Sequence, residues 1–469
     1  MTISLDTSRA ENLRGLCGGD VHLPGDPGYD AARTPWNVAI RQTPAAVAIP
    51  RDASDVSAVV RAAASAGLRI APQSTGHNAG PLAAHGLDDV VIVRTSALDA
   101  VKLDTARNVI RVGGGTLWEP AVDAAADARR AVLHGSSPDV GIAGYSLGGG
   151  IGWFARKLGL ATNSLTAVEL VIGDGTHVRA DATTNPELFW AVRGGGGNFG
   201  VVTALEFRMY PIETAYAGML VWDQARAEKV VRTWSQWAPE APDEVTTALR
   251  LLNLPPLPEL PEAFRGRSLV MIDGAVLDTD DRAADILAEL RALAPEMDTF
   301  GRVPAKSLVR LHMDPEGGTP VVSGNAMLGD FPDAAVDAFL QAAGPGSNTT
   351  LLLAELRQLG GALGRPHDGG GALSHLDGTF AAFAAAIAPT PEAAALGQAD
   401  ANRLTAALVP YSNGRSYLNF AEGAVDVRSG YAEERWIQLK GIRSAVDPQG
   451  TFLANHAIPR LYENGRPTD

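Results

Sequence analysis

The sequence predicts an α+β protein that folds into more than one domain. The chain has 469 residues, enough for two or three domains of ordinary size, and 46% of them are hydrophobic. Apolar strand-like runs alternate with amphipathic helices, and near residue 213 the glycine-dense segments give way to longer helices. Strands and helices that alternate in this way are typical of an antiparallel sheet backed by helices. We therefore expect two α+β units, the second built on an antiparallel sheet.

The first predicted elements lie between residues 44 and 128. Residues 45–49 form a predicted strand, and the helix after it begins at Asp52 or Ser54, either of which can act as its N-cap. Its apolar stripe consists of Val56, Val59, Val60 and Ala63. Further strands are predicted at 68–72, 90–93 and 109–112, followed by a helix at 118–128 with Pro120 in its first turn.

A glycine-dense run comes next, at residues 141–152. Glycine loses more conformational freedom on folding than any other residue, so such a run is costly in an ordinary surface loop. We expect it to serve a close approach of the backbone to a ligand or to another segment. Its glycines are Gly141, Gly144, Gly148, Gly149, Gly150 and Gly152.

The segment that follows contains a glycine motif that resembles a dinucleotide fingerprint. Residues 165–180 predict a hairpin with its turn at Asp174-Gly175, and Asn185-Pro186 opens a helix with Asn185 as its N-cap. The motif G-x-G-x-x-G, at 195–200, lies between this helix and a strand at 201–209. The dinucleotide fingerprint requires a strand before the loop and a helix after it. Because the order here is reversed, we exclude a Rossmann site.

The second half of the chain predicts the larger sheet. Helices are expected at 281–293 and 332–342, with strands at 268–272, 321–327 and 350–356. Near the end of the chain we expect a strand at 416–420 and a helix at 431–446, which Asp447-Pro448 ends.

Bulk properties exclude several classes of function. The net charge of −14 argues against a nucleic acid or an anionic membrane as partner. A single cysteine, Cys17, rules out an intrachain disulfide and a cysteine metal site, and the nine histidines show no metal-ligand spacing. The chain has no apolar window long enough to span a membrane, and Met1–Arg14 does not resemble a signal peptide. We expect a cytoplasmic protein without a metal.

The loop at 74–80 contains the most informative single residue, His77. The loop directly follows the predicted strand at 68–72 and consists mostly of small residues. Small residues let backbone N–H groups approach a phosphate closely, and the histidine offers a nucleophilic nitrogen beside them. Taken alone, such a histidine is more often structural or solvated.

Four segments, at 74–80, 140–153, 185–200 and 417–420, occur together and in this order. The set resembles the FAD-linked oxidases of the vanillyl-alcohol-oxidase (PCMH-type) fold. Within that fold the chain is similar to the berberine-bridge-enzyme-like group, and to its bacterial branch of 6-hydroxy-D-nicotine-oxidase-like enzymes. The resemblance implies an FAD-binding domain of two subdomains at 1–212, with its core at about 40–212. It further implies a substrate-binding domain at 213–412 and a C-terminal segment at 413–469 that returns to the FAD-binding domain.

The resemblance also implies how FAD is held. His77 would carry FAD covalently through the 8α-methyl carbon, Thr75 and Gly76 would hold the pyrophosphate, and Asn419 would anchor the cofactor from the C-terminal segment. The glycine run at 141–152 would lie against the flavin and ribityl chain. The implied cofactor-binding residues are His77, Ser74, Thr75, Gly76, Asn78, Gly80, Ser137, Val140, Gly141, Gly144, Tyr145, Gly148, Gly149, Gly152, Trp153, Asn198, Gly200, Val201, Val202 and Asn419.

The chain departs from the family pattern at two positions. Members with two covalent links have a cysteine just before the proline of a G-x-C-P segment, where this chain has Ser137. The resemblance therefore implies attachment through His77 only. Tyr145 stands where several plant members have a histidine beside the flavin, which leaves open the group that stabilises the reduced flavin. Val140 occupies a position where a small side chain is associated with access of oxygen to the flavin.

Three residues are candidates for catalysis: Tyr417, Glu355 and Tyr145. Glu355 lies in an apolar strand, where a buried carboxylate needs a partner, and Arg357 would share its face. A plain ion pair and a role in the pocket both remain open, and the run E-L-x-x-L-G-G-A-L, which resembles bacterial members, supports the second. Tyr417 could act as a base, orient the substrate or simply pack in its strand. His375 is a weaker candidate, and its surroundings in the sequence favour a surface position.

The expected function is that of an FAD-dependent oxidase. It would take a hydride from a C–O(H) or C–N carbon of a small organic molecule to flavin N5, and O2 would reoxidise the flavin to give H2O2; secondary metabolism is one setting for such an enzyme. A dehydrogenase or flavin oxygenase on the same scaffold is one alternative, and a catalytically silent ligand-binding protein is another. The sequence does not indicate the substrate or the oligomeric state.

Overall fold

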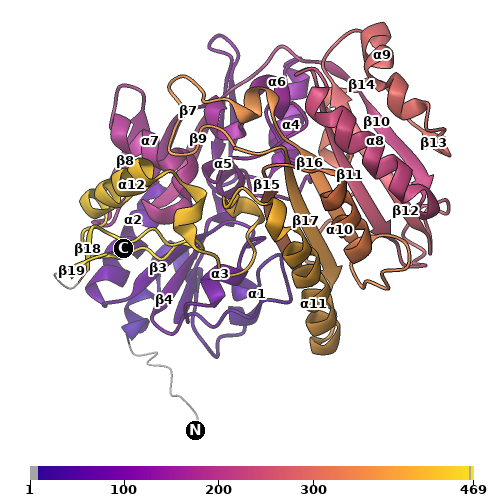
Figure 1. The fold of residues 1–469 in the computed structure, drawn as a ribbon. Coiled ribbons are helices and arrows are strands. Elements are labelled where there is room, and N and C mark those ends of the chain that lie inside the picture. Colours follow the sequence, from indigo (N-terminus) through magenta and orange to yellow (C-terminus); the bar gives the residue numbers. More distant parts are fainter. Residues whose placement is uncertain (1–8, 464–465, 469) are drawn as a thin grey trace.

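The fold of the chain comes from a computed structural model that describes residues 9–463 and 466–468. Residues 1–8, on which the expectation for Met1–Arg14 rests in part, lie outside the described residues. Two smaller sheets form the half of the molecule that contains the N-terminal region, and one large sheet forms the other half (Figure 1). The fold is mixed α and β, as the sequence predicts.

The first small sheet carries the loop that contains His77. Its strand order is β1-β2-β4-β3, in which β2 and β3 run parallel to β4 and β1 pairs antiparallel with β2. The side chain of Asp52 accepts a hydrogen bond from Asp55 N and caps α2, and the predicted apolar stripe of α2 is buried. The elements are β1 (Val21–His22), α1 (Tyr29–Arg33), β2 (Ala46–Ala48), α2 (Ala53–Ser65), β3 (Arg69–Gln73), α3 (Gly80–Ala83) and β4 (Val90–Arg94).

The second small sheet is antiparallel, in the order β5-β6-β9-β7-β8. Helix α7 precedes the glycine motif and strand β9 follows it, so the exclusion of a Rossmann site is confirmed. Asn185 does stand at the start of α7, but its side chain does not cap the helix; its amide donates to Arg179 O, 2.7 Å away. The elements are β5 (Val101–Asp104), β6 (Val109–Gly113), α4 (Trp118–Asp127), α5 (Ile142–Leu147), α6 (Ala155–Leu158), β7 (Leu165–Val171), β8 (His177–Asp181), α7 (Pro186–Gly195) and β9 (Val201–Arg208).

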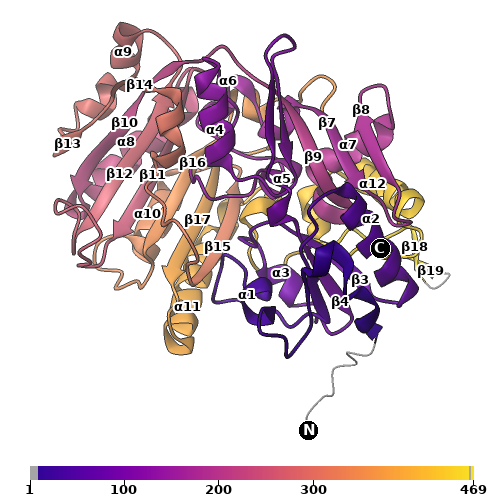
Figure 2. The ribbon, with the colours of Figure 1, turned by 180° about the vertical axis from the view of Figure 1, so that it is seen from behind.

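The large sheet is antiparallel and is backed by helices, as predicted. Its order is β13-β10-β12-β11-β16-β17-β15, and β14 also pairs with β10. Helices α8, α10 and α11 lie in front of it in Figure 1 and behind its strands in Figure 2. The elements are β10 (Thr214–Asp223), α8 (Ala227–Glu240), β11 (Val245–Asn253), β12 (Ser268–Val276), α9 (Asp280–Arg291), β13 (Met297–Asp298), β14 (Gly301–Pro304), β15 (Val321–Leu328), α10 (Asp333–Ala343), β16 (Leu353–Gln358), β17 (Phe380–Ile387) and α11 (Pro391–Leu408).

Alternation along β16 and β17 gives the large sheet two different faces. Ala354 and Leu356 belong to the apolar core shared with the helices, while Leu353, Glu355 and Arg357 point to the opposite side and line a cavity. Strand β16 begins three residues later than predicted, because Thr350 donates its N–H to the carboxylate of Asp400 instead of to a neighbouring strand. Because side chains alternate between the two faces of a strand, Glu355 and Arg357 of this otherwise apolar strand both face the cavity.

The C-terminal segment returns from the large sheet to the first small sheet. Residues 416–420 do not form the predicted strand; Leu418–Phe420 is a short 3-10 turn that crosses the cavity without a strand to pair with. Helix α12 (Glu433–Val446) follows, and Phe452 then forms a parallel bridge with Ile70 of β3. The described chain ends in a small hairpin of β18 (Tyr462–Glu463) and β19 (Arg466–Pro467). The predicted boundaries after residues 212 and 412 fall between β9 and β10 and after α11.

Candidate functional site

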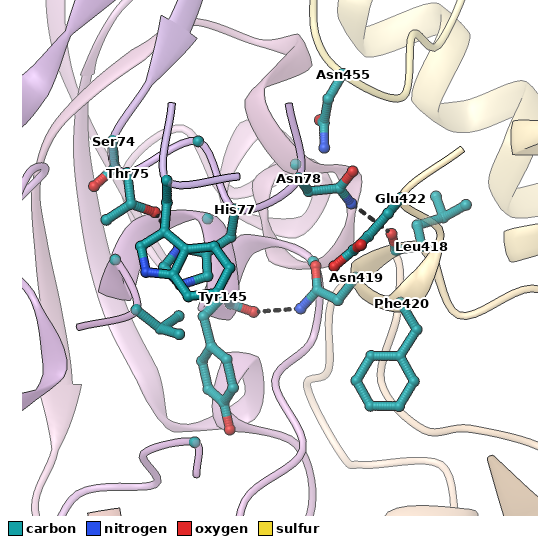
Figure 3. Close-up of a pocket in the computed structure, with 18 of the residues that line it drawn as sticks. Ser74, Thr75, His77, Asn78, Tyr145, Leu418, Asn419, Phe420, Glu422 and Asn455 are labelled. Atoms are coloured by element: carbon teal, nitrogen blue, oxygen red, sulfur yellow. Dashed lines mark hydrogen bonds between the residues drawn. The ribbon is translucent and has the colours of Figure 1, made fainter. Parts of the chain in front are cut away.

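The cavity has a volume of about 410 Å³ and lies where the two halves of the molecule and the C-terminal segment meet. Figure 3 shows the loop around Thr75, the helix α5 region around Tyr145 and the C-terminal segment from Leu418 to Glu422 converging on it. Seventeen predicted residues contribute to its wall. They are Ser74, Thr75, Gly76, His77, Asn78, Ser137, Val140, Gly141, Gly144, Tyr145, Gly148, Asn198, Gly200, Val202, Glu355, Tyr417 and Asn419.

Five other predicted residues lie behind the wall. Gly80 allows the backbone to approach Glu422 O, and Gly152 does the same towards His134 O. Gly149 has a φ of 117° and packs against Leu373 and Tyr417. Trp153 is buried and donates its indole N–H to Leu308 O, and Val201 belongs to the core of the first small sheet. His375 likewise is not part of the wall, and its Nε2 lies 3.4 Å from Asp377 Oδ1.

His77 lies in the loop that follows β3, and other side chains lie against one face of its ring and near both of its nitrogens. Its ring stacks on Trp36 with a centroid separation of 4.1 Å and an angle of 15°. Nδ1 lies 2.7 Å from Thr75 Oγ1, whereas the buried Nε2 makes no hydrogen bond and lies 3.8 Å from Asp139 Oδ1. Burial lowers the pKa of His77 to about 4 despite the carboxylate of Asp139. The imidazole is therefore neutral at pH 7 and keeps a lone pair available for reaction.

Asp139 is a site residue that the sequence analysis missed. Its carboxylate accepts hydrogen bonds from Trp36 Nε1 at 2.7 Å, Ser137 Oγ at 2.8 Å and Gly317 N at 2.7 Å. Burial opposes its ionisation, but these donors together lower the pKa of Asp139. Its place inside the S-P-D-V-G segment, between Ser137 and Val140, was the available signal. Asp139 joins the His77 loop to the segment that carries Gly317.

The glycine-rich segments leave room for a ligand at three positions. A Cβ at Gly144, Gly196 or Gly197 would meet no atom within 4 Å, and all three glycines line the cavity. At Gly141 and Gly148 the close neighbour is instead a side chain of the site, Ser74 and Asn419 respectively. The run at 141–152 therefore leaves space for a ligand at Gly144, while Gly141 and Gly148 pack closely against neighbouring side chains.

Among the residues that the structure describes, several buried polar atoms of the wall have no hydrogen-bond partner; Gln73 Oε1 is one, and four others belong to residues already named. These four are Ser74 Oγ, His77 Nε2, Asn78 Oδ1 and Tyr145 Oη. Buried polar groups are normally hydrogen-bonded, so this set indicates a ligand with several polar groups along its length. FAD has a flat ring system, a polyhydroxyl chain and a pyrophosphate, and the residues present fit it. Burial raises the pKa of Tyr145 well above 10, so its hydroxyl keeps its proton.

Asn198 organises the wall at the glycine motif and uses its full hydrogen-bonding capacity in doing so. Its Nδ2 donates to Gly195 O at 2.8 Å and His456 O at 2.9 Å. Its Oδ1 accepts from Arg443 Nη1 at 2.6 Å and Ile458 N at 2.8 Å. The side chain thus ties the C-terminal segment to the motif, and the neighbouring glycines remain free to face a ligand.

Asn419 and Tyr417 connect the C-terminal segment to the glycine run. Asn419 Nδ2 donates to Tyr145 O at 2.9 Å and lies 3.2 Å from Tyr417 Oη (Figure 3 shows the first bond). Tyr417 Oη also accepts from Gly150 N at 2.9 Å. Burial raises the pKa of Tyr417 to about 12 against the effect of these donors. At pH 7 the tyrosine is a neutral phenol that has its own proton to donate.

A buried charge network closes the end of the cavity beside the large sheet. Glu355 pairs with Arg357, as the same-face spacing predicts, and its Oε1 lies 3.3 Å from His312 Nε2. Burial opposes the charge of Glu355, but Arg357 and His312 lower its pKa to about 2. His312 Nδ1 lies 2.8 Å from Asp273 Oδ2, and Asp273 in turn pairs with Arg250.

His312 is a second residue that the sequence analysis missed. Burial and Arg250 lower its pKa, but Asp273, Asp314 and Glu355 outweigh them and raise it to about 8. Its position in the loop after β14 gives no pattern that connects it to β12 or β16. Across the residues the structure describes, no three His, Cys, Asp or Glu side chains are grouped to hold a metal ion. Within those same residues no helix is long and apolar enough to cross a membrane.

Comparison with known proteins agrees with this geometry. The FAD binding domain family matches residues 44–181. The (R)-6-hydroxynicotine oxidase of Paenarthrobacter nicotinovorans is 36% identical over 211 residues, which are 45% of this chain and 46% of that protein. The glucooligosaccharide oxidase of Sarocladium strictum is 32% identical over 229 residues, which are 47% of this chain and 46% of that protein. The chain thus matches about half the length of these curated relatives.

Solved structures extend the likeness to the whole fold. The 6-hydroxy-D-nicotine oxidase from Arthrobacter nicotinovorans has a TM-score of 0.81 at 25% identity, over 93% of this chain and 96% of that one. The BBE-like 1 protein of Physcomitrella patens has a TM-score of 0.84 at 22% identity, over 97% and 100%, and this second likeness shows the fold alone. Residues 44–181 therefore match the FAD binding domain family, and the chain has the fold of the solved 6-hydroxy-D-nicotine oxidase and BBE-like 1 structures.

Proposed function

We propose that this protein is an FAD-linked oxidase that holds its cofactor covalently through His77 and oxidises a small organic molecule. When bound, FAD accepts a hydride from a C–O(H) or C–N carbon and passes the electrons to O2, which gives H2O2. The observation that carries the proposal is His77 itself: a neutral imidazole, fixed at the cavity wall, with one buried nitrogen that has no hydrogen-bond partner among the described residues. The relatives named above are oxidases, which favours this reaction over others on the same scaffold.

We assign two roles to the residues of the site: some bind the cofactor, and others hold the wall of the cavity in place. In the proposal, Ser74, Asn78 and Tyr145 satisfy their unpaired oxygens on polar groups of FAD, and backbone N–H groups of the 74–78 loop face its pyrophosphate. Asn419 holds the glycine run in place through Tyr145 O. Gly80, Gly149, Gly152, Trp153 and Val201 support this wall from behind.

A single covalent link is the simplest outcome for this chain. Ser137, where a cysteine would provide a second link, donates its hydroxyl to Asp139. The free cysteine, Cys17, is buried in the core of the first small sheet and does not line the cavity. Val140 lines the cavity with a small side chain, which supports access of O2 to the site.

On the substrate side, we propose different roles for Tyr417 and Glu355. The phenol of Tyr417 donates a hydrogen bond and orients the reacting group, because its pKa of about 12 keeps it protonated. Glu355 is ionised and fixed by Arg357 and His312, so it accepts a hydrogen bond from an O–H or N–H of the substrate. His312, whose pKa is about 8, is mostly protonated at pH 7, so it holds Glu355 in its ionised form.

The test uses the purified full-length protein. We expect a yellow protein whose flavin stays with the chain after precipitation with acid and produces a fluorescent band in a denaturing gel. His77→Ala removes the covalent flavin, whereas His85→Ala, an exposed histidine shortly after the loop, retains it. Flavin that is released by acid from the unchanged protein would contradict covalent attachment, and a colourless protein would contradict the FAD site.

The oxidase assignment has its own test. We expect H2O2 to form when the protein is screened in air against panels of alcohols, sugars and amines. Photoreduction without oxygen followed by mixing with air should then reoxidise the flavin at least as fast as turnover. Reoxidation that is far slower than turnover with an artificial electron acceptor would indicate a dehydrogenase instead.

A further inference from the structure

Among the described residues, three carboxylates line the cavity, those of Asp314, Glu355 and Glu422, and a fourth, Asp139, hydrogen-bonds to the lining residues Trp36 and Ser137. All of them except Glu422 are compensated by other groups of the protein. Glu355 is paired with Arg357 and His312, and Asp139 accepts three hydrogen bonds. Asp314 accepts a hydrogen bond from Ser136 Oγ at 3.1 Å and lies in the field of His312, whose pKa it helps to raise. These three carboxylates therefore need no charge from a ligand.

Glu422 is the remaining carboxylate of the cavity wall, and its surroundings are different. It extends from the C-terminal segment between Asn78 and Asn419 (Figure 3) and is half-buried in the wall. The hydroxyl of Ser323 on β15 donates to Oε2 at 2.7 Å. Among the described residues Glu422 has no ion-pair partner, and no charged group contributes to the shift of its pKa. A carboxylate placed this way in a ligand cavity lacks a counter-ion.

The groups around Glu422 do not supply that charge. Phe420 and Phe383, whose ring centroids are 5.3 Å apart, line the same side of the cavity. Asn78 contributes an amide, and the titratable groups of the adjoining wall are His77 and His456. Burial lowers the pKa of both histidines, so both are neutral at pH 7. The guanidinium of Arg357 lies over the Phe420 ring, 5.2 Å from its centroid, but it is paired with Glu355 and forms no ion pair with Glu422. A carboxylate and aromatic rings on one side of a cavity are the usual chemistry of a site for an organic cation.

We propose that Glu422 is the counter-ion for a cationic nitrogen on the substrate, and that Phe420 and Phe383 form the aromatic walls of this subsite. The proposal rests on the proposed function, since it takes the side of the cavity along the large sheet as the substrate side. It adds a substrate class to that function: molecules that bear an ammonium or a quaternary nitrogen. Anionic molecules are disfavoured, because the wall carries the three carboxylates of Asp314, Glu355 and Glu422 against the two cations Arg357 and His312.

Binding of a cation at Glu422 should be linked to a proton. Burial raises the pKa of Glu422 to about 7, with Ser323 acting in the opposite direction. A cation binds to the ionised form, so binding releases the proton of any molecule in which Glu422 is still protonated. Between pH 6 and pH 8 the ionised fraction rises about tenfold for a group of this pKa, and affinity for a cation should rise by the same factor.

The experiment is isothermal titration calorimetry of the full-length protein with benzyltrimethylammonium chloride and, separately, with benzyl alcohol. We expect the cation to bind about tenfold more tightly at pH 8 than at pH 6, and to bind with the same affinity at both values in Glu422→Gln. Glu422→Gln should weaken cation binding at pH 8 by at least about tenfold and leave benzyl alcohol unchanged. Glu434→Gln removes an exposed carboxylate of α12 that does not line the cavity, and should change neither.

Three results would overturn the proposal. They are the absence of cation binding at pH 8, equal cation binding in the unchanged protein and in Glu422→Gln, and a lower FAD content in Glu422→Gln, which would assign the residue to the cofactor. Calorimetry reads cation binding whether or not a flavin is present, while the visible spectrum reports the flavin separately. A failure of the proposed function is thereby distinguished from a failure of this subsite.

Discussion

The reactivity of His77 depends on residues that are distant from it in sequence. Trp36 stacks on its ring, and Asp139 lies beside its free nitrogen. Both neighbours are themselves fixed, since Trp36 Nε1 donates to Asp139 Oδ2. The loop at 74–80 therefore supplies the imidazole that we propose as the attachment point of FAD, while two other segments set its orientation.

The charge network around His312 predicts a specific pH dependence of stability. The pKa of His312 is raised from 6.5 to about 8 in the folded protein, so its protonated form contributes stability that is complete below pH 6.5. That contribution is lost as the pH rises through 8, and a shift of this size corresponds to about 2 kcal/mol. His312→Gln keeps an amide donor but does not titrate. We expect the free energy of unfolding of the unchanged protein to fall by about 2 kcal/mol more than that of His312→Gln between pH 6 and 9.

Urea unfolding at four pH values within this range measures the difference. Glu422 also titrates near pH 7 and is present in both proteins, so its contribution cancels in the comparison. Parallel stability profiles for the two proteins would contradict the raised pKa of His312.

At the scale of single residues, local patterns predicted much of the site. The 74–80 loop, the glycine run and Asn419 all line the cavity or pack directly behind it. Asp139, His312 and Glu422 were missed, because each acts on a group from another part of the chain. Glu355 illustrates both cases: its pair with Arg357 follows from a spacing of two, but its contact with His312 depends on tertiary packing.

Among the elements, the short helix α6 joins the two halves of the molecule through Arg156. The guanidinium of Arg156 is buried and donates to Leu359 O at 2.9 Å, Pro242 O at 3.0 Å, Val245 O at 2.8 Å and Ala241 O at 2.9 Å. These carbonyls belong to the segment before β11, to β11 itself and to the end of β16. A helix of four residues is thus anchored by hydrogen bonds to the large sheet rather than by its own length.

Loss of these bonds should destabilise the contact between the halves. Arg156→Met leaves several buried carbonyl groups without a donor, and we expect the free energy of unfolding to fall by roughly 3 kcal/mol. Lys157→Met is the matched control, because the neighbouring Lys157 forms an exposed pair with Glu244 and should contribute less than about 1 kcal/mol. Urea denaturation followed by tryptophan fluorescence measures both. Equal effects of the two substitutions would contradict the anchoring role of Arg156.

Helices and strands were predicted correctly where the spacing of residues within the segment determines the element. They were predicted wrongly where the element depends on pairing with another segment. The stripe of α2 and the alternation of β16 follow from residue spacing alone. Residues 416–420 have the apolar and aromatic composition of a strand, but they cross the cavity where no neighbouring strand is available. Their polar contacts go to side chains and to the glycine run, as with Asn419 and Tyr145 O. A strand needs a partner, and the local sequence cannot supply one.

At the scale of the whole molecule, the C-terminal segment completes both the cavity and the first small sheet. Phe452 bridges to Ile70, and Arg443 hydrogen-bonds to Asn198, Phe452 O and Ile458 O. Tyr417, Asn419, Glu422 and His456 all reach the cavity from this segment. The cofactor site therefore forms only after the chain has passed through the large sheet and returned.

This arrangement predicts a strong effect of truncation. A chain that ends after Ser412 should retain no flavin and show no cooperative thermal unfolding, because it lacks one wall of the cavity and the bridge from Phe452 to the free side of β3. Arg443→Met in the full chain is a milder test, for which we expect a loss of roughly 3 kcal/mol and a lower melting temperature. Arg435→Met, which removes a single bond to Ala372 O, should have a smaller effect. Differential scanning calorimetry and the visible spectrum measure both properties, and full flavin retention after truncation would contradict the role of the segment.

The sequence by itself determined the mixed fold, the antiparallel large sheet, the reversed glycine motif and the loop that presents His77. All of these depend on residue spacing and backbone freedom within short stretches. Only the tertiary structure decided that Asp139 and Trp36 clamp His77, that His312 shares a charge network with Glu355, and that Glu422 has no counter-ion. The physical reason is that burial and charge pairing depend on which segments meet in space. In this protein, three segments that are far apart in the chain meet around one cavity, and their contacts there set the burial and the charge pairing of its residues.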